Sequence, residues 1–365
     1  MADFFSEATT GFLRPIAAYL TDPDVSEIMV NGPAEIYVEK KGKIYKTKSA
    51  FEDEEQLMAA VRRLSQAVGR TIDATNPMMD ARLPDGSRVH VMIPPCARRG
   101  IYVSIRKFGQ HTLAMKQLVD VGALSIGMAK FLNLCVALAK NIIVSGGTSS
   151  GKTTLLNVIS TLIPPDQRII VIEDSSELQL QQEHVLPMET RPPEANGEGG
   201  VTIRDLLRAS LRMRPDRIVV GEVRGGEALD LLQALNTGHS GSMATIHANT
   251  PKSALARLET LALMSDVNLP LRALRNQVAT AIEIVVQAAR FRDGSRRITH
   301  ISEVRELTDD GQYVVNDLFV FQTQKVDDKG KLVGRHVPTG TLPSFLADAK
   351  AQGFTVDETL FQAVK

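Results

Sequence analysis

The stretch "NIIVSGGTSSGKTTLLNVI", residues 141–159, constrains the fold more than any other part of this sequence. It contains the pattern G-x4-G-K-[ST], with a short β-branched run before it and a helical pattern after it. The glycines let the backbone curl so that successive N–H groups point at phosphate oxygens, and the N-terminus of the following helix adds its positive end. Strand, loop and helix together predict a phosphate-binding turn in a sheet of parallel strands.

The residues of this loop have separate expected roles. Lys152 would bridge the β- and γ-phosphates of ATP, and the hydroxyl of Thr153 would bind Mg²⁺. ATP and Mg²⁺ are therefore the expected cofactors. The residues predicted here to bind the nucleotide are Gly146, Gly147, Thr148, Ser149, Ser150, Gly151, Lys152, Thr153 and Thr154.

Short apolar runs continue after the loop. "RIIVIED", "DRIVVGE" and "SMATIHA" alternate with helical segments, which is typical of a doubly wound α/β sheet covered on both faces. From about residue 282 the pattern predicts antiparallel strands around "RDG" and "DDG" turns, then a short terminal helix. We expect an α/β domain over 121–365, with a β-hairpin and helix extension from about 290 and a mobile loop at 190–200.

The first part of the chain predicts a smaller α+β domain over residues 1–107. A short amphipathic helix is expected at 8–20, then strands joined by "NGP" and "KKGK" turns. "FEDEEQLMAAVRRLSQAVGR" has helical periodicity, "DARLPDGSRVHVMIPP" reads as a hairpin, and "IYVSIRKF" as a further strand. Residues 108–120 are the expected linker.

Composition excludes several classes of protein. The 42 Lys and Arg residues balance 42 Asp and Glu residues, so no overall basic charge favours a nucleic-acid partner. Two cysteines form neither a disulfide framework nor a four-cysteine zinc site. The N-terminus is not a signal peptide, and no run reaches the ~18 apolar residues of a membrane span. We therefore expect a cytoplasmic protein with no direct membrane span.

Carboxylates end two of the apolar runs. Glu173 and Asp174 follow "IIVI", and Glu222 follows "RIVVG". Parallel strands bind ligands at their carboxyl ends, where one carboxylate can join the Mg²⁺ shell and the other can orient the attacking water. We assign Glu222 to the metal and Glu173 to the water, although the reverse assignment fits equally. Asp174 and Glu177 fit the simpler role of acids that begin a helix.

Two histidines, His239 and His247, flank the run "MATI". They have no nearby cysteine or further ligand at metal-binding spacing, so a zinc site is disfavoured. Either can be a structural histidine. His247 ends an apolar run beside the predicted carboxylates, so it can also link a carboxylate or the γ-phosphate to the next helix, with His239 nearer a subunit boundary. We include both among the catalytic candidates.

Arginines form two groups. Arg204, Arg208 and Arg212 repeat every four residues along one helix face, which is either solvated or turned to a neighbouring subunit. Arg224 follows the Glu222 strand end and is placed to touch the nucleotide. In the first domain, an arginine would suit the sensing of a bound nucleotide across a domain boundary, because its planar guanidinium can bind two phosphate oxygens at once. The arginines considered for that role are Arg82, Arg88 and Arg106.

Several of these segments, read together, resemble one family. "IEDSSELQLQQEHV", "ETRPP", the run from "VTIRDLLRAS" to "TIHANTP", and "RLETL" are similar to the secretion ATPase superfamily of type II secretion, type IV secretion and type IV pili. "EIMVNGPAEIYVE", "LPDGSRVHVMIPP" and "YVSIRKF" extend the resemblance toward the CpaF/TadA ATPase of tight-adherence (Flp) pili. The resemblance implies a RecA-like motor domain behind a PAS-like N-terminal domain.

The resemblance also implies an activity and partners. ATP would bind between the two domains of each subunit in a homo-hexameric ring, with Glu173 and Asp174 in an acidic box, Glu222 as the Walker B acid, and both histidines in a histidine box. Arg88 and Arg106 would reach the phosphates. Domain motion would drive an inner-membrane platform protein that adds or removes pilin.

The sequence departs from the family pattern at three points. A segment that precedes the first domain in many members is nearly absent, residue 240 is Ser where an acid is common, and the cysteine-rich insert of type II secretion is missing.

Three other functions are alternatives to a pilus motor. A type IV secretion or conjugation ATPase is the first alternative. A DNA-translocating ATPase is disfavoured by the neutral charge, and an inactive nucleotide-binding scaffold by the two strand-end acids.

Overall fold

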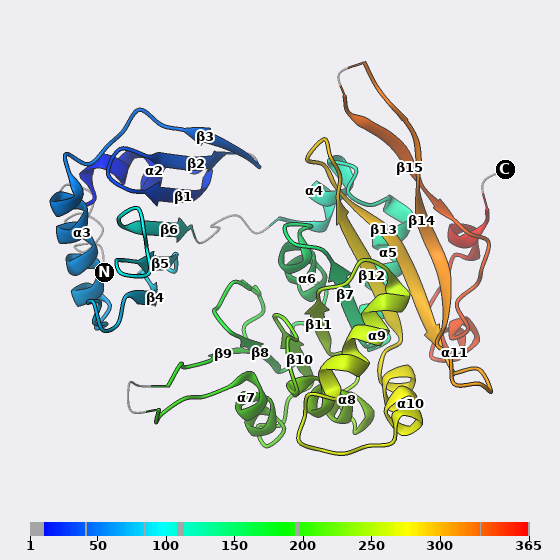
Figure 1. Ribbon diagram of the computed structural model, residues 1–365. Helices are drawn as coiled ribbons and strands as arrows, with labels where there is room; N and C mark the ends of the chain where they lie inside the picture. Colours follow the sequence, from blue (N-terminus) through cyan, green and yellow to red (C-terminus); the bar gives the residue numbers. More distant parts are fainter. Residues whose placement is uncertain are drawn as a thin grey trace. The chain divides into compact units, whose positions relative to one another are not determined.

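The computed structural model describes residues 11–40, 42–83, 85–107, 113–193, 197–328 and 330–363 (Figure 1). The chain divides into two compact units, Met1–His111 and Thr112–Lys365, called here the N-terminal and C-terminal units. Of the expected linker, 108–112 lie outside the described residues. Its second half is helix α4 (Met115–Asp120), and Leu118 on this helix is buried in the core of the C-terminal unit. That half is therefore part of the second unit and no linker.

The N-terminal unit is an antiparallel sheet with helices on one face. The strand order is β3-β2-β1-β6-β5-β4. Helix α3 (Glu54–Ala67) begins at Asp53, whose carboxylate accepts the Gln56 N–H, and it buries an apolar stripe that includes Leu57 and Leu64. The expected first helix is described from residue 11 on. The remaining elements are η1 (Arg14–Ile16), α2 (Ala17–Thr21), β1 (Val25–Asn31), β2 (Ile36–Lys40), β3 (Lys43–Lys46), β4 (Met78–Arg82), β5 (Arg88–Met92) and β6 (Tyr102–Arg106).

The C-terminal unit is built on a nine-stranded sheet in the order β15-β14-β13-β12-β7-β11-β10-β8-β9. The four predicted runs are the parallel strands β7, β8, β10 and β11, so the predicted doubly wound α/β fold is confirmed. The bounds of the parallel strands are β7 (Ile142–Gly146), β8 (Ile169–Glu173), β9 (Val185–Glu189), β10 (Arg217–Val220), β11 (Met243–Ile246) and β12 (Ile284–Arg290).

Two strands differ from the expectation. β12 forms the predicted antiparallel hairpin with β13 (Arg296–Arg305), but on its other side it pairs in parallel with β7. β9 was not predicted, because it is a half-exposed edge strand that contains Pro187 and lacks a continuous apolar run. The predicted extension contains β14 (Val314–Val326), β15 (Leu332–Pro338), α11 (Leu346–Ala351) and η2 (Glu358–Phe361).

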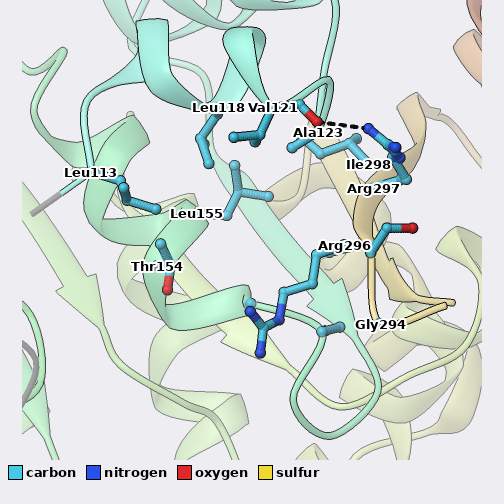
Figure 2. Close-up of a pocket in the computed structure, with 14 residues that line it drawn as sticks. Leu113, Leu118, Val121, Ala123, Thr154, Leu155, Gly294, Arg296, Arg297 and Ile298 are labelled. Carbon is cyan, nitrogen blue, oxygen red and sulfur yellow. Dashed lines mark hydrogen bonds between the residues drawn. The ribbon is translucent and has the colours of Figure 1, made fainter. Parts of the chain in front are cut away.

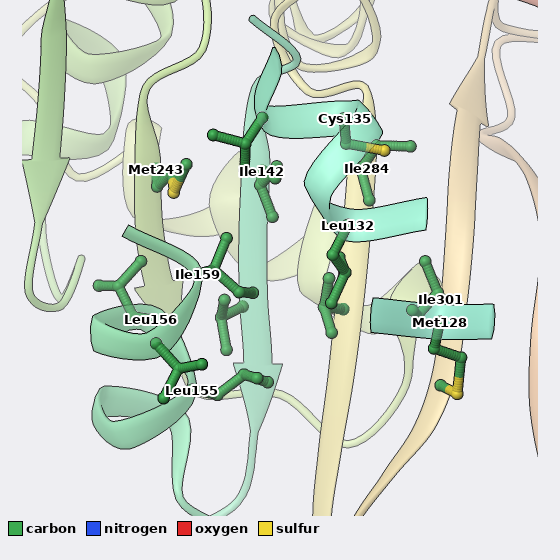
Figure 3. Packing of buried hydrophobic residues seen from close by; sticks show 14 of the residues in the cluster. Met128, Leu132, Cys135, Ile142, Leu155, Leu156, Ile159, Met243, Ile284 and Ile301 are labelled. Carbon is green, nitrogen blue, oxygen red and sulfur yellow. The ribbon is translucent and has the colours of Figure 1, made fainter. Parts of the chain in front are cut away.

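Helices cover both faces of this sheet. One core packs α4, α5 and α6 with the C-terminal α11 and η2, and the other packs the four helices from α7 to α10. In the first core, Leu156 and Ile159 of α6 and Leu132 of α5 lie against Ile142 of β7 (Figure 3). The helices not yet bounded are α5 (Ile126–Ala137), α6 (Lys152–Ser160), α7 (Ile203–Ser210), α8 (Glu227–Asn236), α9 (Pro251–Ala262) and α10 (Leu271–Ala281).

The burial of β7 positions the phosphate loop. All five residues of β7 are buried, and the strand lies between β11 and β12. The loop from Gly147 to Gly151 therefore leaves from the carboxyl edge in the interior of the sheet, where ends of neighbouring strands can surround it. None of the helices in the described residues has the length and apolar character needed to cross a membrane.

Candidate functional site

The loop between β7 and α6 curls around one carbonyl oxygen. Ser150 donates to the Gly147 carbonyl from its backbone N–H at 3.4 Å and from its hydroxyl at 2.8 Å. The Lys152 ammonium donates to the same oxygen at 3.2 Å. Hydrogen-bond donors therefore converge inside the loop, which is the arrangement by which such a loop receives a phosphate group.

Backbone geometry holds the loop in this shape. Gly151, the N-cap of α6, has φ of 91°, and Ser149 has φ of 58°, which is left-handed for a residue with a side chain. A Cβ at Gly146 would lie 2.4 Å from the Ser150 hydroxyl oxygen and 2.6 Å from the Ala288 carbonyl oxygen. A side chain at Gly146 would therefore displace the loop or β12.

Charged side chains from three strand ends meet beside the loop. Oε1 of Glu222, after β10, lies 2.6 Å from Nε2 of His247, after β11. Nζ of Lys152 lies 3.3 Å from the same imidazole nitrogen. Arg224 forms ion pairs with Glu222 at 2.5 Å and with Asp174, after β8, at 2.9 Å. Lys152 is thus joined to the ends of β8, β10 and β11 by a continuous row of polar contacts.

Electrostatics set the protonation states in this row. Burial lowers the pKa of Lys152, and the Glu222 carboxylate opposes that shift. Burial and the charge of Lys152 both lower the pKa of His247. The imidazole is therefore neutral at pH 7, with one nitrogen that donates and one that accepts. The Lys152 ammonium lies 3.3 Å from Nε2 and 3.5 Å from Nδ1, so the ring lies between this cation and the Glu222 carboxylate.

Glu173, at the end of β8, is held by the loop that follows it. Its carboxylate accepts the N–H of Glu177 at 2.9 Å and of Leu178 at 3.1 Å, and its side chain is buried. A Cβ at Gly221 would approach Glu173 Cγ to 2.8 Å, so the glycine leaves room for this side chain. Glu173 thus lies between the ends of β8 and β10, at the same sheet edge as Glu222. Its role toward water stays a prediction.

His239 lies at the opposite edge of the sheet. It precedes β11, whereas His247 follows that strand. Nδ1 of His239 is 3.3 Å from the Ala234 carbonyl oxygen at the end of α8. Within one chain the structure therefore places only His247 beside the phosphate loop. A role for His239 at a nucleotide would need a neighbouring chain, and it stays a prediction.

The arginines of α7 are occupied within their own chain. Arg204 donates from Nε to Oδ2 of Asp230 at 2.8 Å, and Arg208 donates to Oδ1 at 2.8 Å. Asp230 is buried on α8. These two arginines therefore clamp α7 to α8, and the expectation that the row also faces a neighbouring subunit stays a prediction.

The arginines of the N-terminal unit stand in one row. Arg88 on β5 pairs with Arg82 on β4 and with Arg106 on β6. Val89 and other alternate residues face the core under α3, so the arginines lie on the opposite face of the sheet. Like charges side by side are unfavourable unless an anion or carboxylate compensates them, and Glu27, paired with Arg106, supplies one such carboxylate.

A cavity of about 340 Å³ opens beside the phosphate loop, within the C-terminal unit (Figure 2). Gly151 and Thr154 line one side, and the turn between β12 and β13 lines another. Its walls come from segments far apart in the chain, so the sequence pattern did not identify the cavity. The arginines around the "RDG" turn are a local sequence signal for it. Apolar lining residues include Leu113, Leu118, Ala123, Leu155 and Ile298.

The fold and this loop define the class of the protein. The P-loop follows an interior strand of a mostly parallel sheet, and a strand-end acid and a histidine lie beside its lysine. This arrangement is that of the RecA-like P-loop ATPases. The chain belongs to the type II/IV secretion system protein family, whose model matches residues 12–312.

Individual relatives agree with this family. The chain is 36% identical over 302 residues to a putative conjugal transfer protein of Mycobacterium tuberculosis, covering 81% of this chain and 84% of that protein. It is 36% identical over 312 residues to the type IV secretion system protein PtlH of Bordetella pertussis, covering 78% of this chain and 91% of that protein.

Solved structures share the fold. The pilus retraction motor PilT with bound ADP aligns with a TM-score of 0.56 at 20% identity, covering 93% of this chain and 86% of PilT. The ATPase DotB of Legionella pneumophila aligns with a TM-score of 0.55 at 17% identity, covering 82% of this chain and 81% of DotB.

The different positions of the two histidines lead to a prediction. We expect His247→Ala to lower kcat for ATP hydrolysis about tenfold, because Lys152 and Glu222 lose the imidazole between them. His239→Ala should impair turnover only at protein concentrations where chains associate. Steady-state hydrolysis over a range of protein concentrations checks both expectations, and metal analysis should show no change. Stoichiometric zinc lost in either variant would contradict the assignment.

Proposed function

We propose that this chain hydrolyses ATP with Mg²⁺ and acts as the motor of a homo-hexameric ring. The contact of Lys152, His247 and Glu222 at the mouth of the P-loop carries the proposal. Phosphoryl transfer depends mainly on positioning and on charge stabilisation. In our proposal Lys152 holds the β- and γ-phosphates and Glu173 orients the attacking water. His247 links the bound γ-phosphate to Glu222.

The donor set beside the loop suits Mg²⁺. This ion prefers oxygen ligands, keeps several waters and needs only one or two protein ligands besides the phosphates. Thr153 follows Lys152 in the first turn of α6, and Glu222 follows β10 at the same edge of the sheet, so a hydroxyl and a carboxylate are available. When bound, the ion would neutralise charge on the transferred phosphoryl group.

The nucleoside part of ATP would enter the cavity beside the loop. Its walls are mostly apolar, which suits a planar base, and Gly151 and Thr154 connect it to the phosphate site. Arg224 would touch the nucleotide from the end of β10. Arg88 and Arg106 of the N-terminal unit would contact the phosphates across a domain or subunit boundary, because a planar guanidinium can grip two oxygens. Hydrolysis would then move the two units against each other.

We place this motor in a tight-adherence (Flp) pilus system. The support is the resemblance of the segments that form β1, β2, β5 and β6 to the CpaF/TadA branch. The motor would act in the cytoplasm, peripheral at the inner membrane through platform proteins, and would add or remove pilin. A second candidate is a type IV secretion or conjugation ATPase, favoured by the relatives named as a conjugal transfer protein and as PtlH.

A gene replacement in the host cell tests whether the motor serves a pilus or a secretion system. A chromosomal Lys152→Ala replacement should abolish surface pili and leave DNA transfer and protein export unchanged. Electron microscopy of the cells and mating assays measure these two outcomes side by side. Normal pili together with lost transfer or export would favour the second candidate.

A further inference from the structure

Arg296, at the start of β13, crosses over the P-loop from the outside. Its Nε donates to the Ser149 carbonyl at 2.9 Å, and its Cδ would lie 3.3 Å from a Cβ at Gly151. In Figure 2 the side chain reaches from the hairpin toward the N-terminal end of the helix that carries Thr154. Among the described residues, no partner other than the Ser149 carbonyl is found for this guanidinium.

The contact holds the loop in its phosphate-binding shape. Ser149 has a left-handed φ of 58°, a conformation that is unfavourable for a residue with a side chain. Across a trans peptide, the carbonyl of Ser149 and the N–H of Ser150 point in opposite directions. Because Arg296 holds that carbonyl outward, the Ser150 N–H points inward, where it contacts the Gly147 carbonyl at 3.4 Å.

The turn that presents Arg296 is itself anchored at two places. The neighbouring Arg297 donates to the Val121 carbonyl at 2.9 Å and to that of Gly122, at the end of α4 (Figure 2). On the other side of the turn, Asp293 accepts the backbone N–H of Leu332, the first residue of β15, at 2.8 Å. The P-loop, the first helix of the C-terminal unit and the β14–β15 hairpin therefore meet at one turn.

We propose that Arg296 is a positioning residue for the P-loop, presented by a turn that Arg297 ties to α4 and Asp293 ties to β15. The inference rests on the proposed ATP function and deepens it. Arg296 sets the affinity for the triphosphate and leaves the chemical step unchanged, since it holds a carbonyl on the outside of the loop. Movement of α4 or of the β14–β15 hairpin then changes nucleotide affinity through this turn.

The test separates KM from kcat. In the full-length chain, Arg296→Gln should raise KM for ATP about tenfold, which is the 1.4 kcal/mol of one charge-assisted hydrogen bond, and change kcat less than about twofold. Arg296→Lys should recover part of the affinity, because its ammonium can still donate to the Ser149 carbonyl. Asp293→Ala should raise KM about threefold, since the turn loses its anchor on β15.

Inorganic tripolyphosphate distinguishes positioning from contact with the base. Its inhibition constant against ATP should rise in Arg296→Gln as much as KM does. The matched control is Arg292→Gln, an exposed arginine in the same turn, which should leave both constants unchanged. An unchanged tripolyphosphate constant, an unchanged KM, or an equal effect in Arg292→Gln would overturn the inference. A wild-type chain that neither binds nor hydrolyses ATP would overturn the proposed function itself, and the inference with it.

Discussion

Lys152→Ala is expected to reduce ATP hydrolysis at least about a hundredfold, because its ammonium donates to the Gly147 carbonyl on the inside of the P-loop, where the phosphates would bind. The same change should not lower the melting temperature of the nucleotide-free protein. Burial lowers the pKa of Lys152, which means that the folded state tolerates the charge poorly. Hydrolysis and thermal unfolding, measured on the same preparation, check both statements.

Lys140 offers a matched control at the other end of the same strand. It precedes β7 and forms an ion pair with Glu283 at 2.7 Å. Lys140→Ala should therefore lower the melting temperature and keep hydrolysis within about twofold of wild type, since surface and half-buried pairs are worth on the order of 1 kcal/mol. Equal losses of activity in both lysine variants would argue against a specific phosphate-binding role for Lys152.

The second large effect is expected at the strand-end carboxylates. Glu173→Gln should lower kcat about 100-fold or more with little change in ATP binding, because the amide cannot accept a proton from the attacking water. The amide oxygen can still accept the N–H groups of Glu177 and Leu178, so the loop should keep its shape. Glu222→Gln should instead raise the Mg²⁺ concentration needed for half-maximal activity.

Titrations of Mg²⁺ at saturating ATP distinguish the two role assignments. If Glu222→Gln loses kcat at every Mg²⁺ concentration and Glu173→Gln shows the altered metal requirement, the roles are reversed. If Glu173→Gln and Glu222→Gln both hydrolyse ATP at the wild-type rate, the proposed catalytic carboxylates are wrong.

Local patterns predicted the architecture around the P-loop. The β-branched runs before Gly146, Glu173 and Glu222 correspond to buried parallel strands, since a strand covered on both faces must be apolar at every position. The loop itself follows from glycine positions and from the helix that begins at Lys152. The sequence did not predict that β12 pairs in parallel with β7, because an apolar run has the same signature in a parallel strand as in an antiparallel one.

The histidines show where sequence reasoning stops. His239 and His247 are eight residues apart, and their spacing alone is consistent with one site. The strand Met243–Ile246 passes between them, so they leave the sheet at opposite edges. Likewise, the spacing of Arg204 and Arg208 in the sequence suggests a solvated basic helix face. In the structure both arginines donate to Asp230 of α8.

The sequence by itself determined the curl of the phosphate loop, the alternation of strands and helices, and the strand-end acids, because these depend on residues within one turn or one strand of each other. The tertiary structure alone decided that His247 lies between Lys152 and Glu222 and that Arg296 reaches Ser149. Such meetings depend on the order of strands in the sheet. That order is selected by the burial of two apolar faces at once, which no single segment encodes.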